Sequence, residues 1–292
     1  MATNGSGSVR AVVITGASTG IGEACALRLD KDGWRVFAGV RKEADGLKLK
    51  QQASERLTPV MIDVTDEGSI MRAEEAVRAA VGEAGLAGLV NNAGVAVAGP
   101  LEFMKIGDLR QQLEVNTVGQ IAVTQAFLPL IRKGSGRIVN IGSIAGKMAT
   151  PFLGPYTASK HAIEALTDAL RQELRPWKIH VAVVEPGSIA TPIWEKSQQR
   201  ADDLEQSLPE GAMMLYGKPF NAMREAARKF EAAGVPPDRV AKAVQHALTS
   251  GRPRTRYIVG FDATMQRIIA AVVPDRMRDR LVAWQLKLPS KP

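Results

Sequence analysis

The sequence predicts an α/β fold in which helices cover both faces of a single, doubly wound parallel sheet. Two patterns predict it. Short apolar segments alternate with segments of helical period through the first two thirds of the 292 residues. The apolar segments contain almost no polar residues, which is typical of parallel strands that are buried on both faces. Because no linker or change of composition divides this part of the chain, we expect one domain.

The expected strands and helices follow each other at short intervals. The strands are expected at residues 11–15, 35–39, 58–62, 86–90, 136–141, 179–184 and 257–259. The helices are expected at residues 20–31, 66–81, 106–132, 155–175 and 237–250. This order places the folded domain at residues 9–260.

Three segments stand apart from this alternation. Residues 1–8 are rich in Gly and Ser, and we expect a disordered tail there. Residues 193–235 form a long excursion with an apolar patch, which is typical of a lid over a binding site. Residues 261–292 are expected to form a basic helix or tail.

The composition is that of a soluble globular protein, with 45% hydrophobic and 23% charged residues. No apolar run approaches the ~18–20 residues that a membrane span requires. Cys25 is the only cysteine, so an intrachain disulfide is impossible, and we expect a reducing, cytoplasmic location. No metal site is predicted.

The net charge of +8 is concentrated at the C-terminal end, where residues 252–292 hold nine Lys or Arg against three Asp. Such a segment is either a solvated surface or a basic amphipathic end that makes a weak contact with an anionic membrane or a partner. Nucleic-acid binding is not expected, because no basic stripe with interleaved aromatic residues occurs.

A glycine-rich turn, Thr15-Gly-Ala-Ser-Thr-Gly-Ile-Gly22, joins the first expected strand to the first expected helix. Glycines at this place let the backbone approach a pyrophosphate, and the helix N-terminus favours the phosphate charge. The turn therefore predicts a dinucleotide site, although its spacing is not the commoner G-x-G-x-x-G.

Tyr156 and Lys160 are four residues apart in an expected helix and so share one face. A nearby ammonium stabilises a phenolate, so we expect Lys160 to lower the pKa of Tyr156 toward neutrality. Ser143, thirteen residues before Tyr156, supplies a hydroxyl that can hold a substrate oxygen. These three residues predict proton transfer to or from an alcohol or a carbonyl.

Together these motifs resemble the short-chain dehydrogenase/reductase family, in its classical branch. The resemblance covers about residues 9–191, and its motifs occur in family order. They are Thr15-Gly-x-x-x-Gly-x-Gly22, Asp63-Val64, Asn91-Asn-Ala-Gly94, Asn116, Ser143, Tyr156-x-x-x-Lys160 and Pro186-Gly187 with Thr191. The resemblance implies a Rossmann-type fold and hydride exchange with a nicotinamide dinucleotide.

The same resemblance implies a role for each of these positions. The implied catalytic residues are Asn116, Ser143, Tyr156 and Lys160. Asn116 would kink its helix and hold a water, and Ser143 would polarise the substrate oxygen. Tyr156 would be the general acid/base, and Lys160 would bind the nicotinamide ribose. Its dinucleotide-binding residues are Gly16, Ser18, Thr19, Gly20, Ile21, Gly22, Asp63, Val64, Asn92, Ala93, Gly94, Tyr156, Lys160, Pro186, Gly187, Ile189 and Thr191.

The second expected strand indicates which cofactor is used. Members of this family that prefer NAD usually place an acidic residue after that strand, where this chain has Val40. Arg41 and Lys42 follow at once, and a guanidinium binds a 2′-phosphate that a carboxylate would repel. With Ser18 as a further donor, we expect NADP(H); NAD(H) stays an alternative.

The expected substrate is a small hydrophobic alcohol or carbonyl compound, because the residues expected around the cleft are apolar. Besides Ser143, the expected substrate residues are Val95, Phe152, Met213 and Met214. Residues 237–260 loosely resemble steroid- and retinol-type members. Family members commonly pair through the helices that hold Asn116 and Tyr156, so a homodimer or homotetramer is expected.

Two alternatives remain at this stage. One is a catalytically silent protein that binds a dinucleotide or acts as a scaffold, although such proteins generally lose Ser, Tyr or Lys. The other is an NAD-dependent sugar-nucleotide epimerase, which shares Tyr-x-x-x-Lys but usually lacks the Asn-Asn-Ala-Gly motif.

Overall fold

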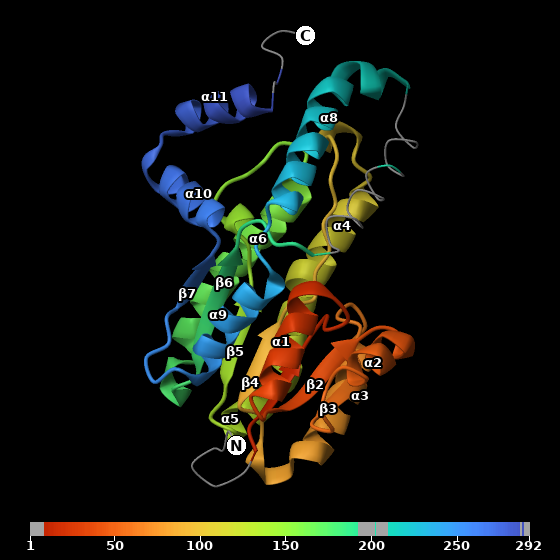
Figure 1. Cartoon of the computed structure of the whole chain (residues 1–292), viewed down its shortest axis with the longest axis vertical. Coiled ribbons are helices and arrows are strands. Elements are labelled where there is room, and N and C mark those ends of the chain that lie inside the picture. The colour runs from red at the N-terminus through yellow and green to blue at the C-terminus, as the bar shows by residue number, and fades with distance from the viewer. Residues whose placement is uncertain (1–8, 192–201, 203–209, 287, 289–292) are drawn as a thin grey trace.

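Seven parallel strands form one sheet in the order β3-β2-β1-β4-β5-β6-β7 in the computed structural model, which describes residues 9–191, 202, 210–286 and 288 (Figure 1). The strands are β1 (Ala11–Ile14), β2 (Arg35–Val40), β3 (Leu57–Met61), β4 (Gly88–Asn91), β5 (Arg137–Ile141), β6 (His180–Pro186) and β7 (Arg256–Val259). Every neighbouring pair is parallel. The predicted doubly wound α/β fold is therefore confirmed.

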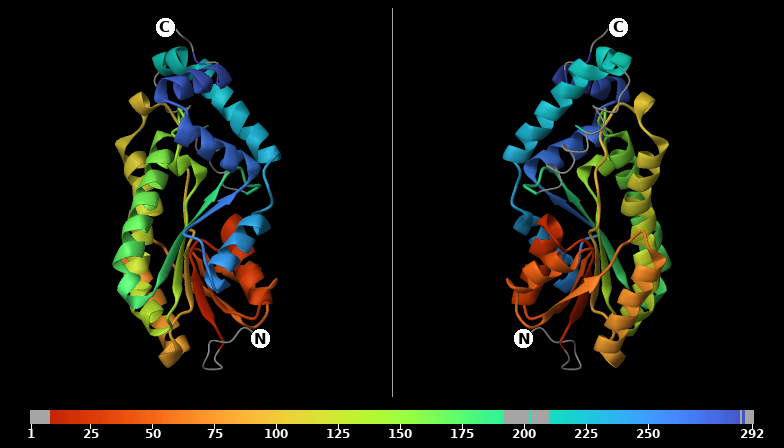
Figure 2. Two further views of the ribbon diagram at one scale, coloured as in Figure 1. Left: turned by 90° about the vertical axis from the view of Figure 1, so that its left-hand side faces the viewer. Right: turned by 90° about the vertical axis from the view of Figure 1, so that its right-hand side faces the viewer.

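Helices cover the sheet on both faces, as Figure 2 shows in its two edge-on views. The helices are α1 (Gly20–Lys31), α2 (Glu43–Lys50), α3 (Glu67–Val81), α4 (Ile106–Leu113), α5 (Gly119–Lys133), α6 (Gly154–Glu173), α8 (Glu210–Ala232), α9 (Pro237–Thr249), α10 (Phe261–Val272) and α11 (Asp275–Gln285). Successive residues of β1 serve the two layers alternately: Val12 packs into the core under α1 and α9, and Val13 into the core under α3 and α5. This is why β1 is apolar at every position.

The sheet order reverses at β1, which lies between β2 and β4. The connections that leave β1 and β4 therefore run to opposite faces and separate at the carboxyl ends of these strands. In open α/β sheets this is where a crevice for a ligand forms. The topology thus brings the turns after β1 and β4 to the same place.

The helix expected at residues 106–132 is two α-helices, α4 and α5, joined by a π turn over Glu114–Val118. Helices α2 and α8 are not predicted from the sequence, and α10 and α11 lie where one basic helix or tail is expected. The expected tail, residues 1–8, lies outside the described residues, as do residues 193–201 and 203–209 of the expected lid.

The C-terminal helices lie at one end of the molecule, close to α8 (Figure 1). A small apolar cluster joins these parts: Leu286 at the end of α11 and Phe220 on α8 pack with Phe152 from the loop before α6. Within the described part of the chain, none of the helices has both the length and the hydropathy that crossing a bilayer requires.

Candidate active site

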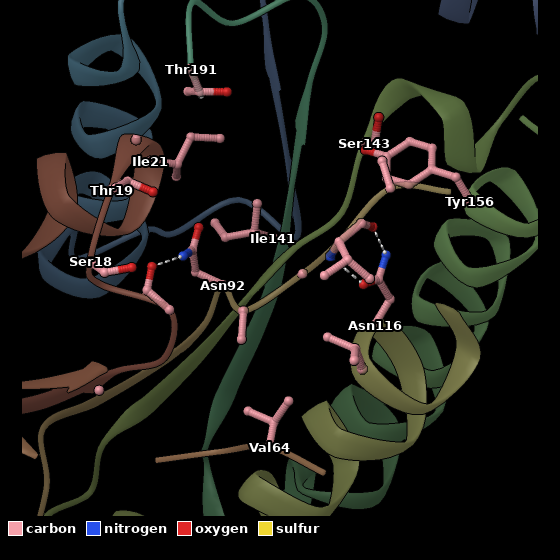
Figure 3. Close-up of a pocket in the computed structure, with 18 of the residues that line it drawn as sticks. Ser18, Thr19, Ile21, Val64, Asn92, Asn116, Ile141, Ser143, Tyr156 and Thr191 are labelled. Atoms are coloured by element: carbon pink, nitrogen blue, oxygen red, sulfur yellow. Dashed lines mark hydrogen bonds between the residues drawn. The ribbon is translucent and has the colours of Figure 1, made fainter. Parts of the chain in front are cut away.

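A cavity of about 510 Å³ opens at the carboxyl ends of the central strands. The turns that follow β1, β2, β3, β4, β5 and β6 all contribute to its lining, together with the π turn and the start of α6. Seen from the cavity, Ser18, Thr19 and Ile21 stand on one side, and Ser143 and Tyr156 stand on the other (Figure 3).

The glycine-rich turn after β1 is packed so closely that it tolerates no side chain at two positions. Gly16 has a φ of +64°, and a Cβ there would lie 2.8 Å from Ala93 Cα. A Cβ on Gly22 would overlap the carbonyl oxygen of Gly16. Asn92, which follows β4, fixes the turn by donating from Nδ2 to the oxygens of Thr15 at 2.9 Å and Gly16 at 3.0 Å.

This turn leads into α1, whose N-cap residue Thr19 makes no side-chain hydrogen bond to the helix. The first backbone N–H groups of a helix have no intrahelical partner. Since Thr19, Gly20 and Ile21 line the cavity, these donors and the positive end of the helix dipole are directed at it. The cavity wall therefore offers an anion-binding position of the kind that pyrophosphates occupy.

Two oppositely charged side chains line the cavity beyond this turn. Arg41 directly follows β2, and Asp63 follows β3. Burial works to raise the pKa of Asp63, but hydrogen bonds from the Thr65 backbone and hydroxyl, with the charge of Arg41, bring that pKa below its ordinary value. Asp63 therefore stays ionised at neutral pH as an acceptor.

Asn116 lies in the π turn between α4 and α5 and is fully buried. Its Oδ1 accepts from Val95 N at 2.8 Å, while its Nδ2 donates to Val95 O at 3.0 Å and to Ser159 Oγ at 3.1 Å. The Asn116 side chain thus links the turn after β4 to α6. This explains why the polar residue occurs inside a helical segment, where π turns often mark functional sites.

Ser143 and Tyr156 come from different elements and meet at the cavity (Figure 3). Ser143 caps a short helical turn, Ile144–Gly146, and its Oγ accepts from Ala145 N at 3.1 Å. Tyr156 is on the first turn of α6. Burial raises the pKa of Tyr156, and the hydrogen bond with Ser143 works in the opposite direction without cancelling the rise.

Lys160 lies one turn after Tyr156, is buried, and donates from Nζ to the carbonyl oxygen of Ile141 at 2.8 Å. Its Nζ is 5.8 Å from the centre of the Tyr156 ring. Burial lowers the pKa of Lys160 to about 8, although the Glu164 carboxylate opposes that change. The pKa of Tyr156 is therefore raised where a lowered value is expected, because burial of the phenol has a larger effect than the Ser143 hydrogen bond.

Most of the predicted site residues line this one cavity. They are Gly16, Ser18, Thr19, Gly20, Ile21, Arg41, Asp63, Val64, Asn92, Ala93, Gly94, Val95, Asn116, Ser143, Tyr156, Lys160, Pro186, Gly187, Ile189 and Thr191. Five predicted residues are not in the lining. Gly22 packs behind the turn, Lys42 points to solvent as the N-cap of α2, Phe152 packs against α8, and Met213 and the strongly exposed Met214 lie on α8 itself.

The lining also contains residues that the sequence analysis missed. Ile141 and Gly142 end β5 immediately before Ser143, and the rule that ligands bind at the carboxyl ends of parallel strands could have found them. Gln111 and Glu114 come from the end of α4 and the start of the π turn, where the local sequence gives no such signal.

Asp262 is a further missed residue that shapes the site without lining it. Ser188 N donates to its carboxylate at 2.7 Å, and any Cβ on Gly187 would collide with that carboxylate. The first turn of α10 therefore holds the Pro186–Gly187 turn in place, although the two segments are about seventy residues apart.

Comparison with known proteins agrees with this geometry. The family described as short chain dehydrogenase matches residues 10–202. The chain is 36% identical over 284 residues to the NADPH-dependent 3-dehydrocapnine reductase of Ornithobacterium rhinotracheale, covering 96% of this chain and 98% of that protein. It is 37% identical over 286 residues to the retinol dehydrogenase 5 of Mus musculus, covering 96% and 90%.

Among solved structures, the chain resembles a short chain dehydrogenase from Burkholderia cenocepacia J2315 in complex with NADP. The TM-score is 0.70 at 26% identity, over 96% of this chain and 98% of the other. The cavity, the order of its motifs and these similarities lead to one conclusion: the chain belongs to the short-chain dehydrogenase family.

Proposed function

We propose that this protein interconverts a hydrophobic secondary alcohol and the corresponding ketone, or an aldehyde and its alcohol, with NADP(H) as the hydride carrier. One observation supports the proposal above all others. Ser143, Tyr156 and Lys160 converge on the cavity that also contains the glycine-rich turn and the N-terminus of α1.

The residues of the chain account for the proton that the reaction needs. In carbonyl reduction the carbonyl carbon gains a hydride and its oxygen gains the proton of the Tyr156 hydroxyl; alcohol oxidation is the reverse. Ser143 holds the same oxygen through its hydroxyl. Lys160 places a positive charge beside the phenol and so stabilises the phenolate that forms when the proton leaves. A bound nicotinamide ring supplies or accepts the hydride.

The residues around the cavity fit a nicotinamide dinucleotide. The turn after β1 brings backbone to the cavity wall at Gly16 and Gly20, and the uncapped end of α1 favours the phosphate charge. Asp63 is an ionised acceptor for the adenine amino group. We expect Lys160 to donate to the nicotinamide ribose and Pro186–Gly187 to border the nicotinamide end, since all three residues line the cavity.

Arg41 supports NADP(H) over NAD(H). It lines the cavity directly after β2, where Val40 replaces the acidic residue that would accept from a ribose 2′-hydroxyl. A guanidinium there can bind a 2′-phosphate in a bidentate manner. The names of two similar proteins, an NADPH-dependent reductase and a structure in complex with NADP, agree with this assignment.

The substrate assignment is supported by the apolar side chains near Ser143 and Tyr156. Val95, Ala96 and Ile189 line the cavity, and the similar retinol dehydrogenase is named for a hydrophobic alcohol. We place the remaining contacts on α8, which packs on Phe152 through Phe220, with ring centres 5.5 Å apart.

The Tyr156→Phe variant tests the function. It removes only the proton carrier, so turnover of any accepted carbonyl should fall about 10²–10⁴-fold. NADPH binding, followed by fluorescence, should stay close to wild type. The assay is NADPH and NADH consumption with steroids, retinal, aliphatic aldehydes and quinones. Undiminished turnover in the variant refutes the role of Tyr156, and a wild-type protein that binds NADPH but turns over nothing supports a catalytically silent protein instead.

We also propose that α10 and α11 make a weak contact with an anionic membrane surface. Phe261, Val272 and Trp284 are between 70% and 81% exposed, and the neighbouring Arg276 and Arg280 are exposed as well. Apolar and basic side chains on the same helices match the acyl boundary and the anionic headgroups.

Vesicle flotation tests this contact on the full chain. Vesicles that contain phosphatidylserine should carry part of the protein upward, neutral phosphatidylcholine vesicles should not, and Trp284→Glu should abolish the effect. Equal recovery of the wild type and the Trp284→Glu variant with both kinds of vesicle would contradict it.

A further inference from the structure

Beneath the catalytic residues lies a cluster of four charged side chains from four different segments: Lys147, Glu164, Glu185 and Arg256, here called the ion cluster. Lys147 Nζ is 2.6 Å from Glu164 and 3.8 Å from Glu185. Arg256 is 3.2 Å from each of the same two carboxylates. Each cation therefore contacts both anions.

The two carboxylates are almost entirely removed from water. The Glu185 side chain is 0% exposed and that of Glu164 is 8% exposed. Both oxygens of Glu185 and Oε1 of Glu164 accept no hydrogen bond within the part of the chain that the structure describes. Burial and the nearby Glu164 raise the pKa of Glu185 despite Lys147 and Arg256. Removing these charges from water costs free energy that their mutual attraction often does not recover, so fold stability alone does not account for the cluster.

The location of the ion cluster supplies that reason. Lys147 ends the short helical turn that begins at Ser143. Glu164 follows Lys160 by one turn on α6, and so shares a face with Tyr156 and Lys160. Glu185 is the residue of β6 immediately before Pro186. The cluster therefore joins the two segments that carry Ser143, Tyr156 and Lys160 to the strand that ends at Pro186.

Glu164 lies directly against the Ser143 turn. A Cβ on Gly142 would be 3.4 Å from Glu164 Oε1, and a Cβ on Gly146 would be 3.0 Å from Glu164 Cγ. Gly142 is next to Ile141, whose carbonyl accepts the hydrogen bond from Lys160. The Glu164 carboxylate is thus buried close beneath the residues that hold the Lys160 ammonium.

We infer that Glu164 is a positioning residue for the proposed reaction, which keeps Lys160 protonated and holds the Ser143 turn against α6. This inference rests on the proposed function, because it assigns Glu164 a role through Lys160 and Ser143. The negative charge of Glu164 acts on the protonation of Lys160. The size and shape of its side chain act on the position of the Ser143 turn.

Several charged or titratable groups surround Lys160, and Glu164 is the one whose charge counters the effect of burial on it. Tyr156 lies one turn before Lys160 on α6, and Glu114 of the π turn lines the same cavity as Lys160. Glu185, Lys147 and Arg256 lie beyond Glu164, with Asp168 bound to Arg256 at 2.7 Å and Arg267 of α10 near Glu185. Burial lowers the Lys160 pKa to about 8, and without the Glu164 charge it would fall further.

The test is the pH dependence of NADPH binding, measured by fluorescence titration above pH ~7, where the 2′-phosphate is fully ionised. In the wild type, affinity should fall above the Lys160 pKa of about 8, because the ammonium is lost. In Glu164→Gln this fall should begin about one pH unit lower. An unchanged pH of the fall, with NADPH still bound, overturns the inference.

Asp168→Asn is the matched control. It removes one carboxylate from the same helix and the same arginine, but one turn further from Lys160. The pH at which affinity falls should stay where it is in the wild type. A shift as large as that of Glu164→Gln would show that any loss of charge near Arg256 has this effect, and would also overturn the inference.

Lys147→Gln provides a test of opposite sign, which remains informative if Glu164→Gln does not fold. This substitution removes the cation closest to Glu164, so the negative charge of Glu164 is less neutralised and raises the pKa of Lys160 more strongly. The fall in NADPH affinity should therefore move to higher pH. A fall that stays in place or moves to lower pH overturns the inference. These readings depend on binding alone, so they are separate from the activity of Tyr156→Phe, which tests the proposed function.

Discussion

The pKa of Tyr156 depends on two opposing effects. Burial raises this pKa, and the Ser143 hydrogen bond offsets only part of the rise. The phenol therefore keeps its proton at neutral pH. This protonated phenol is the form that donates a proton in the reductive direction of the proposed reaction.

We expect cofactor choice to depend on one side chain, Arg41, directly after β2. The Arg41→Asp variant replaces a guanidinium at the cavity wall by a carboxylate that repels a 2′-phosphate. The ratio of kcat/KM for NADPH to that for NADH should fall about tenfold or more.

Lys42→Asp makes the same change of charge one residue further on, where the side chain is exposed and outside the cavity lining. This control should leave the ratio within about twofold of wild type, since exposed charges interact weakly through water. Equal effects of the two substitutions would mean that only the general charge of this loop matters.

Individual site residues could be predicted from the sequence where their role depends on neighbours close in the chain. Gly16, Ser143, Tyr156 and Lys160 stand in spacings that fix a turn or a helix face. Glu164 and Asp262 could not be found in this way. Their roles come from partners that are distant in sequence, such as Arg256 and Ser188, and only the folded chain brings them together.

Among the elements, α4 and α5 show where prediction from periodicity stops. The helical period continues through residues 106–132, so it predicts one helix. The π turn around Asn116 is fixed instead by hydrogen bonds to Val95 and Ser159, which belong to other elements. The amphipathic α8 was missed because its sequence was interpreted as a loop excursion.

The close approach of α6 to the Ser143 turn gives a prediction at this scale. In Gly146→Ala, the new Cβ would lie 2.9 Å from the carbonyl oxygen of Lys160, so the turn or the helix must move by several tenths of an ångström. We expect a loss of about 1–3 kcal/mol in the free energy of unfolding, by urea denaturation. Because Ser143 and Tyr156 then separate, kcat should also fall about tenfold or more.

Gly251→Ala is the control for this change, since a Cβ at Gly251 meets no atom within 4 Å and its φ is not positive. Both stability and kcat should match the wild type. Wild-type kcat in Gly146→Ala would show that the spacing between α6 and the Ser143 turn is not critical.

For the whole molecule, the alternation of strands and helices was sufficient to predict one parallel sheet, because burial on both faces leaves a strong apolar signal. The place of the C-terminal helices was not predictable from it. Asp262 of α10 reaches the Pro186–Gly187 turn, and Leu286 of α11 packs with Phe152 beside α6. The segment expected to be a basic helix or tail therefore also supports the candidate active site.

The last prediction concerns assembly. The outer side of α6 exposes small side chains, Ala158, Ala165 and Ala169, which let a second helix pack closely. We expect a homodimer or homotetramer that uses this face. Light scattering after size exclusion should give a multiple of the 31.3 kDa chain mass.

Ala165→Arg should reduce that mass to one chain, because a buried guanidinium without a partner prevents packing. Ala79→Arg, at an exposed alanine of α3 on another helix, should leave the mass unchanged. A wild-type protein that elutes as a single chain would contradict the assembly altogether, and an Ala165→Arg protein of unchanged mass would place the contact elsewhere.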